Sequence, residues 1–383
     1  MMKNPLEVLN IWQKLDFRKS FVLGMIALVV LSFVAGCIGG ETQTPGAQTS
    51  APAETYELKM ATFYLAGDPG FEIAQHFADE VEKMSNGRIK IEVYQAGELG
   101  FPVTEIVDST ANGVVDIAIF YSSYLASQDP VLALAGGKPG PISNPYELFY
   151  QVKTVEDLIQ KSFEKFGVVY IGPMIYGEPE ILVSRVPINR LSDLNGKILR
   201  SSGLAAVFYN TLGAQAMMMA SGELYQALQL GTIDGLEWTD YTADYKMGFH
   251  EVAKYVLEPT PGVNLHSEAA VHAFLIVNPD LWNKLPDDLK EIIKVASRES
   301  YLWGSHYVNT LNREYRQKWI EAGATLVKLP PEDNQKIIET AIQLHVEYAK
   351  KSPEAQEYIS RLVKVWRDLG HDEWADALEA ALG

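Results

Sequence analysis

The sequence predicts an α/β fold with two lobes, and three observations support this prediction. Strand and helix patterns alternate from Tyr56 onward, in the order of βαβ units. The chain has 383 residues, a length that suits two lobes better than a single core. A helical pattern without internal proline covers residues 287–323, and a helix of that length can brace both lobes.

The first strand and the first helix follow Tyr56. Leu58, Met60 and Thr62 occupy alternate positions, which indicates a half-buried strand. Asp68 and Pro69 begin the helix, because aspartate caps helix N-termini and proline fits the first turn. Apolar residues then recur at helical spacing, at Phe71, Ala74, Phe77, Ala78, Val81 and Met84.

Later segments continue the alternation. Asn86 and the glycine after it end the first helix, and residues 89–93 alternate as a strand. Residues 114–120 form a nearly continuous apolar run, as expected of a strand that is covered on both faces. Ser221 can cap a further helix and Gly231 can end it. The remaining predicted strands are residues 168–171, 181–184, 197–200 and 233–237.

The N-terminus has the pattern of a signal peptide, which we place at residues 1–36. An apolar run at residues 21–33 ends in Val-Ala-Gly-Cys and is shorter than the about 20 residues of a transmembrane helix. This ending resembles a lipobox, in which Cys37 would be lipidated and become the mature N-terminus. The alternative is an uncleaved anchor in which Cys37 has no role. Residues 37–55 predict a flexible tether, and both interpretations place the remaining chain outside the membrane.

Composition excludes several kinds of site. Cys37 is the only cysteine, which leaves no disulfide, thiolate metal site or cysteine nucleophile. A net charge of −17 argues against nucleic acid and anionic membranes as partners, but not against a small anionic ligand. The sequence has no GxSxG, P-loop or GxGxxG motif, and its seven histidines show no HExxH spacing. We therefore do not expect an enzyme.

Four stretches, in the correct order, resemble the substrate-binding proteins of TRAP transporters. The clearest is Leu224–Trp238 (LYQALQLGTIDGLEW), which resembles the family segment ALQ-x-G-x-IDG-x-E. Leu194–Ser201 (LNGKILRS) resembles its L-x-G-x-K-x-R strand. Phe274–Pro286 (FLIVNPDLWNKLP) and Asn86–Leu99, which ends in AGEL, resemble two further family segments.

The resemblance implies a type II periplasmic-binding-protein-like fold, with hinge strands between two lobes and a long helix bracing both. Lobe I would comprise residues 56–177 with 268–300, and lobe II residues 178–267. The long helix would cover residues 287–323, followed by a C-terminal helical segment, 324–383. Such a protein closes on its ligand and delivers it to TRAP membrane subunits. Whether residues 352–383 cover a lobe or pair two chains into a homodimer stays open.

The chain looks closest to the subgroup that binds 2-oxo or 2-hydroxy carboxylates with a metal ion. The resemblance implies that Arg200 clamps the carboxylate, which its planar guanidinium can meet with two parallel hydrogen bonds. It implies roles at the ligand for Tyr124, Glu178 and Trp238, and at the metal for Glu178, Glu237, Trp238 and Glu268. Each has an ordinary alternative: a surface arginine, solvated carboxylates, or core aromatic residues.

The three glutamates would repel an anionic ligand unless a cation lay among them. Carboxylate oxygens suit a hard cation such as Ca²⁺ or Na⁺. A glutamate at position 178, where glutamine also occurs in the subgroup, favours Ca²⁺ over Na⁺. The sequence departs from the family at residues 134–141 (LAGGKPGP) and 263–266, which leaves the identity of the carboxylate open.

Two other functions remain as alternatives. The same glutamates could serve as acid and base groups of a secreted metal-dependent enzyme acting on a carboxylate. The fold could also be the ligand-sensing module of a signalling system. Residues 217–219, three methionines, predict a space-filling apolar strand rather than a metal site.

Overall fold

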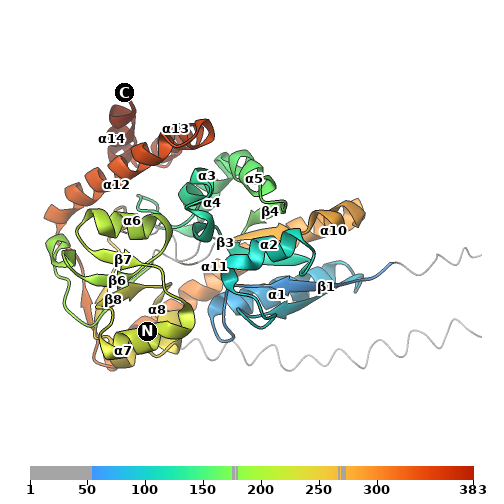
Figure 1. The fold of residues 1–383 in the computed structure, drawn as a ribbon, viewed down its shortest axis with the longest axis horizontal. Coiled ribbons are helices and arrows are strands. Elements are labelled where there is room, and N and C mark those ends of the chain that lie inside the picture. The colour runs from blue at the N-terminus through green and yellow to red at the C-terminus, as the bar shows by residue number, and fades with distance from the viewer. Residues whose placement is uncertain (1–53, 175–176, 178–179, 266–267, 269–272) are drawn as a thin grey trace, which may run out of the picture. The chain divides into compact units, whose positions relative to one another are not determined.

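The computed structural model describes residues 54–174, 177, 180–265, 268 and 273–383 (Figure 1). The predicted signal peptide, Cys37, Glu178 and all of the tether except its last two residues lie outside these ranges. The chain divides into two compact units, Met1–Pro52 and Ala53–Gly383, and the description below concerns the second unit. Among the described residues, no helix has the length and apolarity needed to cross a membrane.

The first sheet has five strands in the order β2-β1-β3-β10-β4. Strands β1, β2 and β3 run parallel, whereas β10 is antiparallel to both β3 and β4. All residues of β3 and β10 are buried, which explains their uninterrupted apolar sequences. The strands are β1 (Tyr56–Ala61), β2 (Ile89–Tyr94), β3 (Ile117–Tyr121), β4 (Val169–Pro173) and β10 (Ala273–Val277).

Helices from the first part of the chain pack around this sheet. Asp68 caps α1 as predicted, its carboxylate accepting a hydrogen bond from Gly70 N at 2.7 Å. The helix ends where Asn86 and Gly87 adopt positive φ angles of 54° and 76°. The helices are α1 (Pro69–Met84), α2 (Ile106–Ala111), α3 (Pro130–Ala135), α4 (Pro145–Thr154) and α5 (Glu156–Glu164).

The second sheet has six strands in the order β11-β9-β5-β8-β6-β7. Strands β6 and β8 are parallel, and β5 is antiparallel to β8. The strands are β5 (Leu182–Ser184), β6 (Ile198–Arg200), β7 (Gln215–Met217), β8 (Gly235–Glu237), β9 (Tyr255–Leu257) and β11 (Thr325–Val327). The accompanying helices are α6 (Gly203–Thr211), α7 (Leu224–Leu230), α8 (Tyr241–Lys246) and α9 (Phe249–Val252).

The two sheets define the two lobes, so the predicted two-lobed α/β fold is confirmed. After α10 (Pro279–Lys284), the predicted long helix appears as α11 (Asp287–Glu321). It contacts α1 beside the first sheet and α8 beside the second, so it braces both lobes (Figure 1). At Gly304 a Cβ atom would lie 2.7 Å from Ile73 Cδ1, so a larger residue at this close crossing of α11 and α1 would have to displace the Ile73 side chain.

The C-terminal segment covers the first lobe instead of extending away from it. Its helices are α12 (Asn334–Ala349), α13 (Pro353–Asp368) and α14 (Asp372–Leu382). They pack on one another, α13 also contacts α3 and α4, and α12 contacts both α3 and α6. Tyr358 and Trp366 of α13 are fully buried in the larger hydrophobic core. Burial of these large rings is the physical reason that the segment folds against the lobe.

Two local predictions were wrong. Ser221 does not cap α7, because residues Ser221–Glu223 form a 3-10 turn and α7 begins after Glu223 without a side-chain cap. Met217 and Met218 do not fill a core, since they are 47% and 46% exposed, whereas Met219 is partly buried against the smaller core. A short strand at a sheet edge leaves its side chains partly in solvent, which local apolarity does not reveal.

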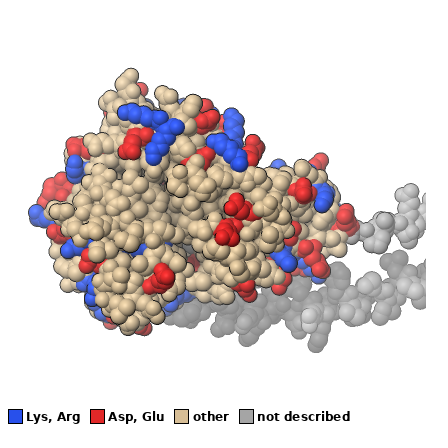
Figure 2. All heavy atoms as spheres, in the orientation of Figure 1, with Lys and Arg blue, Asp and Glu red and all other residues tan. Residues whose placement is uncertain are grey.

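On the face shown in Figure 2, basic side chains are interspersed with acidic ones and form no continuous basic stripe. This face therefore lacks the basic stripe that a nucleic-acid phosphate backbone would contact.

Candidate functional site

Parallel strands of both sheets direct their carboxyl ends toward one small cavity. Tyr121 ends β3, and Phe63 lies two residues beyond the end of β1. Arg200 ends β6 and Glu237 ends β8 in the other lobe. Ligands of open α/β sheets bind outside the carboxyl ends of strands. The cavity has a volume of about 20 Å³ and is lined by Phe63, Tyr121, Tyr124, Glu180, Arg200, Ser202, Glu237, Trp238 and Thr239.

Arg200 is the cationic group of the cavity and is only 3% exposed. Its Nη1 donates to the backbone carbonyl of Glu237 at 2.6 Å, and its Nη2 lies 3.8 Å from the sulfur of Met218. The guanidinium carbon lies 4.7 Å from the centre of the Trp238 ring, a cation–π contact. No carboxylate of the described residues pairs with this guanidinium. A buried charge needs a partner, so the geometry suits an anionic ligand.

Glu180 and Glu237 form a carboxyl pair beside Arg200, and both are 1% exposed. Ser201 Oγ donates to Glu237 Oε2 at 2.7 Å. The two glutamates share a hydrogen bond, and Glu180 is placed by β5, whose Leu182 pairs with Glu237 across the strands. Burial raises the pKa of Glu180 well above its usual value, and the charge of Glu237 and their hydrogen bond raise it further. Such a pair holds either a proton or a cation.

Aromatic rings and polar atoms complete the cavity wall. The rings of Phe63, Tyr121 and Tyr124 lie 5.5–6.2 Å apart, with Tyr124 edge-on to the other two. Burial raises the pKa of Tyr121 and of Tyr124, so both hydroxyls stay protonated and can donate hydrogen bonds. Three buried atoms have no hydrogen-bond partner among the described residues: Trp238 Nε1, Thr239 Oγ1 and Ser202 Oγ. Unsatisfied buried donors around one cavity indicate a binding site.

The structure brings together four of the residues singled out from the sequence: Tyr124, Arg200, Glu237 and Trp238. Glu180 was missed. The local sequence Glu-Pro-Glu offers two glutamates, and only the strand register shows that Glu180 reaches the cavity. Phe63 and Tyr121 were missed as well, although each stands just past or at the end of a predicted strand, which was the available signal.

Glu268 is fully buried but is not among the described residues that line the cavity. Its Oε2 forms an ion pair with Lys138, also fully buried, and accepts a hydrogen bond from Gln151 Nε2 at 2.8 Å. Gln151 Oε1 in turn accepts from Trp366 Nε1 at 2.9 Å. Lys138 lies within residues 134–141, where the sequence departs from the family pattern. This departure was the sequence signal for a buried ion pair between Lys138 and Glu268.

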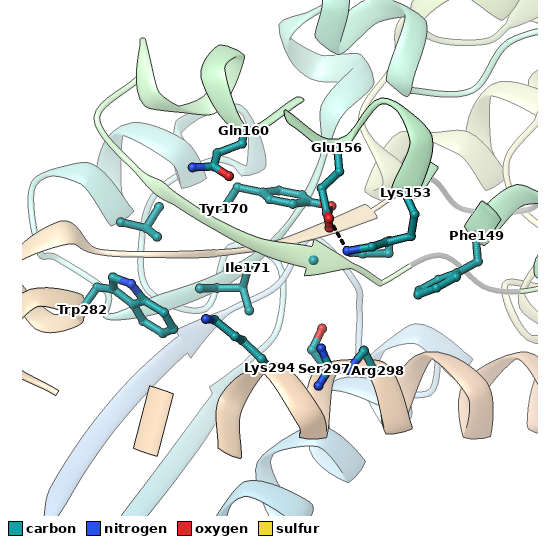
Figure 3. Close-up of a pocket in the computed structure, with 13 residues that line it drawn as sticks. Phe149, Lys153, Glu156, Gln160, Tyr170, Ile171, Trp282, Lys294, Ser297 and Arg298 are labelled. Atoms are coloured by element: carbon teal, nitrogen blue, oxygen red, sulfur yellow. Dashed lines mark hydrogen bonds and ion pairs between the residues drawn. The ribbon is translucent and has the colours of Figure 1, made fainter. Parts of the chain in front are cut away.

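A larger groove of about 350 Å³ runs along β4 between α5 and α11 (Figure 3). Its lining includes none of the predicted site residues. Its charged side chains pair with neighbours: Lys153 with Glu156, and Arg298 with Glu291 at 3.3 Å. These charges are already paired at the surface. An anion would therefore gain less electrostatic stabilisation in this groove than beside Arg200, which has no carboxylate partner among the described residues.

Among the described residues, no group of three or more His, Cys, Asp or Glu side chains is arranged to hold a metal ion. The residues that line the cavity include two glutamates, Glu180 and Glu237, together with serine, threonine and tyrosine residues that carry hydroxyl groups. Oxygen donors of this kind suit a hard cation whose remaining ligands come from the bound solute.

The two-lobed α/β fold holds a buried arginine between its lobes that has no carboxylate partner among the described residues, as a receptor for an anionic solute would. Residues 60–352 match the model of DctP, the bacterial extracellular solute-binding protein family 7. The chain belongs to this family, the solute receptors of TRAP transporters, which work outside the cytoplasm.

Curated relatives and solved structures agree with this assignment. A monocarboxylate 2-oxoacid-binding periplasmic protein of Nostoc is 29% identical over 315 residues, 81% of this chain and 84% of that protein. A TRAP solute-binding protein of Colwellia psychrerythraea, solved with calcium and pyruvate, has a TM-score of 0.72 at 24% identity and covers 86% of this chain and 98% of its own. One from Bordetella bronchiseptica, with calcium and picolinate, has a TM-score of 0.76 at 23% identity, with coverages of 86% and 96%.

Proposed function

We propose that this chain captures a small 2-oxo or 2-hydroxy carboxylate and delivers it to the membrane subunits of a TRAP transporter. The observation that carries the proposal is Arg200, a buried guanidinium with no carboxylate partner among the described residues. A ligand carboxylate would supply the missing charge and accept two parallel hydrogen bonds. The cavity of about 20 Å³ favours an acid head as small as that of pyruvate or lactate.

Closure of the lobes would bury this acid head. Arg200 and Glu237 belong to one lobe, and Tyr121 and Tyr124 belong to the other, so an open form would lose half of the site. Hinge closure of this kind gives the membrane subunits a ligand-dependent shape to recognise. In this proposal Tyr124 donates its hydroxyl to the ligand, and Trp238 forms a wall on which the guanidinium stacks.

A metal cation fits beside the acid head, between Glu180 and Glu237. Two hydrogen-bonded carboxyl groups that are both 1% exposed repel one another when ionised, and a cation would remove that repulsion. The cation would supply positive charge for the ligand's carboxylate and α-oxygen. Glu180 and Glu237, with the backbone carbonyl of Trp238, would hold it, and two carboxylates favour Ca²⁺ over Na⁺. The Colwellia psychrerythraea relative, solved with calcium and pyruvate, supports this part.

The roles of two other glutamates follow from their positions. Glu178 lies outside the described residues and stays a candidate ligand of both cation and solute. Glu268, in this proposal, acts through its ion pair with Lys138, which ties the chain just before β10 to the first lobe.

The same proposal includes a membrane anchor and needs no catalysis. Lipidation of Cys37 would tether the folded unit to the outer face of the cell membrane, beside the membrane subunits. Capture and release of the solute suffice for this role, which requires no chemical reaction. Sustained turnover of a bound acid would instead favour a secreted enzyme. A sensing module would bind the same acids without joining TRAP membrane subunits.

Calorimetric titration of the folded unit with pyruvate and lactate tests the proposal. Arg200→Ala should weaken binding by about 30-fold or more, because it removes one partner of a buried charge pair. Arg200→Lys keeps the positive charge but cannot form the two parallel hydrogen bonds of a guanidinium. Arg298→Ala removes an exposed arginine and serves as the matched control. If no carboxylate binds, or if Arg200→Ala binds as tightly as the wild type, the site assignment is wrong. Loss of binding on chelation supports Ca²⁺, and loss only in sodium-free buffer supports Na⁺.

A further inference from the structure

A second pocket, of about 320 Å³, opens directly beside the small cavity. The two share Tyr124 and Ser202 in their walls, so they are neighbours at the place where the two lobes meet. The small cavity has room for little more than an acid head. Whatever follows that head along the ligand would therefore lie in the second pocket.

The residues that line this second pocket are uncharged, and many of them carry hydroxyl groups. None of its lining residues is Asp, Glu, Lys, Arg or His, although 21% of the chain is charged. Hydroxyls come from Thr104, Ser123, Ser127 and Ser202, besides the two tyrosines of the wall. Ser202 is 5% exposed and its Oγ has no hydrogen-bond partner among the described residues. A charged tail would lose its hydration here without a counter-charge, whereas a hydroxylated tail would find donors and acceptors.

Both lobes build the pocket, so closure would enclose a tail as well as a head. Ser123 and Ser127 follow β3 in the first lobe, and Ser202 and Gly203 follow β6 in the second. At Gly203 a Cβ atom would lie 2.7 Å from Ser123 Oγ, and φ is +55°. The lobes therefore meet at the floor of the pocket, in a contact that only glycine permits.

We infer that the natural ligand carries an uncharged, hydroxyl-bearing tail of several carbons behind its acid head, and that this pocket binds the tail. The inference rests on the proposed function, because Arg200 must hold the head. It narrows the ligand from any small 2-oxo or 2-hydroxy acid to a polyhydroxylated one.

Four probes separate head from tail in calorimetric titrations of the wild-type folded unit. Lactate has the head alone, and gluconate has a hydroxylated tail. 2-Hydroxyhexanoate has an apolar tail of the same carbon number, and glucarate has a hydroxylated tail that ends in a second carboxylate. Gluconate should bind at least about tenfold tighter than each of the other three.

Ser127→Trp tests the location of the tail, because Ser127 is an exposed residue at the pocket mouth and its substitution does not disturb the core. The preference for gluconate over lactate should fall to about one. Gln128→Trp adds the same bulk one residue away, outside the pocket lining, and should keep the preference.

The outcomes separate a failure of the tail inference from a failure of the proposed function. If lactate binds and gluconate binds no more tightly, the tail inference is wrong and the proposed function stands. If gluconate is preferred but Ser127→Trp keeps that preference, the tail lies elsewhere and the inference is again wrong. If neither pyruvate nor any of the four probes binds, the proposed function itself fails.

Discussion

Removing the charge of Lys138 should destabilise the protein more than its position in a loop suggests. Lys138 and Glu268 are both fully buried and form an ion pair, and Gln151 donates to the same carboxylate oxygen at 2.8 Å. Lys138→Met leaves the Glu268 charge in the core with one amide hydrogen bond. Breaking a buried pair from one side costs about 3–5 kcal/mol, so the melting temperature should fall by roughly 5–10 °C.

The double variant Lys138→Met/Glu268→Gln should recover most of this loss. It removes both charges, and the side-chain amide that replaces the Glu268 carboxylate can keep the contact with Gln151. Lys153→Met is the matched control, because Lys153 pairs with Glu156 at the surface, where such pairs contribute about 0–1 kcal/mol. Differential scanning calorimetry of the wild type and these three variants measures the effect. The reasoning is refuted if Lys138→Met costs no more than Lys153→Met, or if the double variant is no more stable than the single one.

Two further predictions concern closure and pH. Gly203→Ala should prop the lobes apart and weaken pyruvate binding by about tenfold, since its Cβ would meet Ser123 Oγ at 2.7 Å. Gly222→Ala, with no atom near its new Cβ, should bind normally, and equal affinities would contradict the closure contact. Burial raises the pKa of Asp240 to about 6, above its value of 3.8 when unfolded. The folded state then holds the extra proton, so about 3 kcal/mol of stability present below pH 4 is lost as the pH rises through 6. Asp240→Asn keeps the oxygen that caps α8 and should flatten this decline in urea titrations at pH 4 to 7; an unchanged slope would disprove the assignment.

Local patterns predicted the elements well where one periodicity continued over many residues. The helix at 287–323 appears as α11, and the apolar run at 114–120 overlaps β3, which ends one residue later at Tyr121. Predictions that depended on a single side chain were less secure. Ser221 was expected as a cap, yet a 3-10 turn intervenes, because several turn conformations compete within about 1 kcal/mol.

The candidate site was only partly within reach of the sequence. Arg200 and Glu237 stand at the ends of strands whose motifs resemble a family, so both were found. Glu180 was not found, because the choice between two glutamates depends on how β5 pairs with β8. Lys138 was noticed only as a departure from the family pattern, and its partner lies 130 residues away in the chain.

The sequence by itself determined where strands and helices form and that α11 is long enough to brace two lobes. It also determined that the chain resembles solute receptors. These properties arise from neighbours within a few residues, whose spacing decides which face is apolar. Only the tertiary structure decided which carboxyl group stands beside Arg200, which lysine neutralises Glu268, and that a hydroxyl-lined pocket lies next to the cavity of Arg200. Those pairings join residues that are distant along the chain, and they depend on strand register and lobe contact.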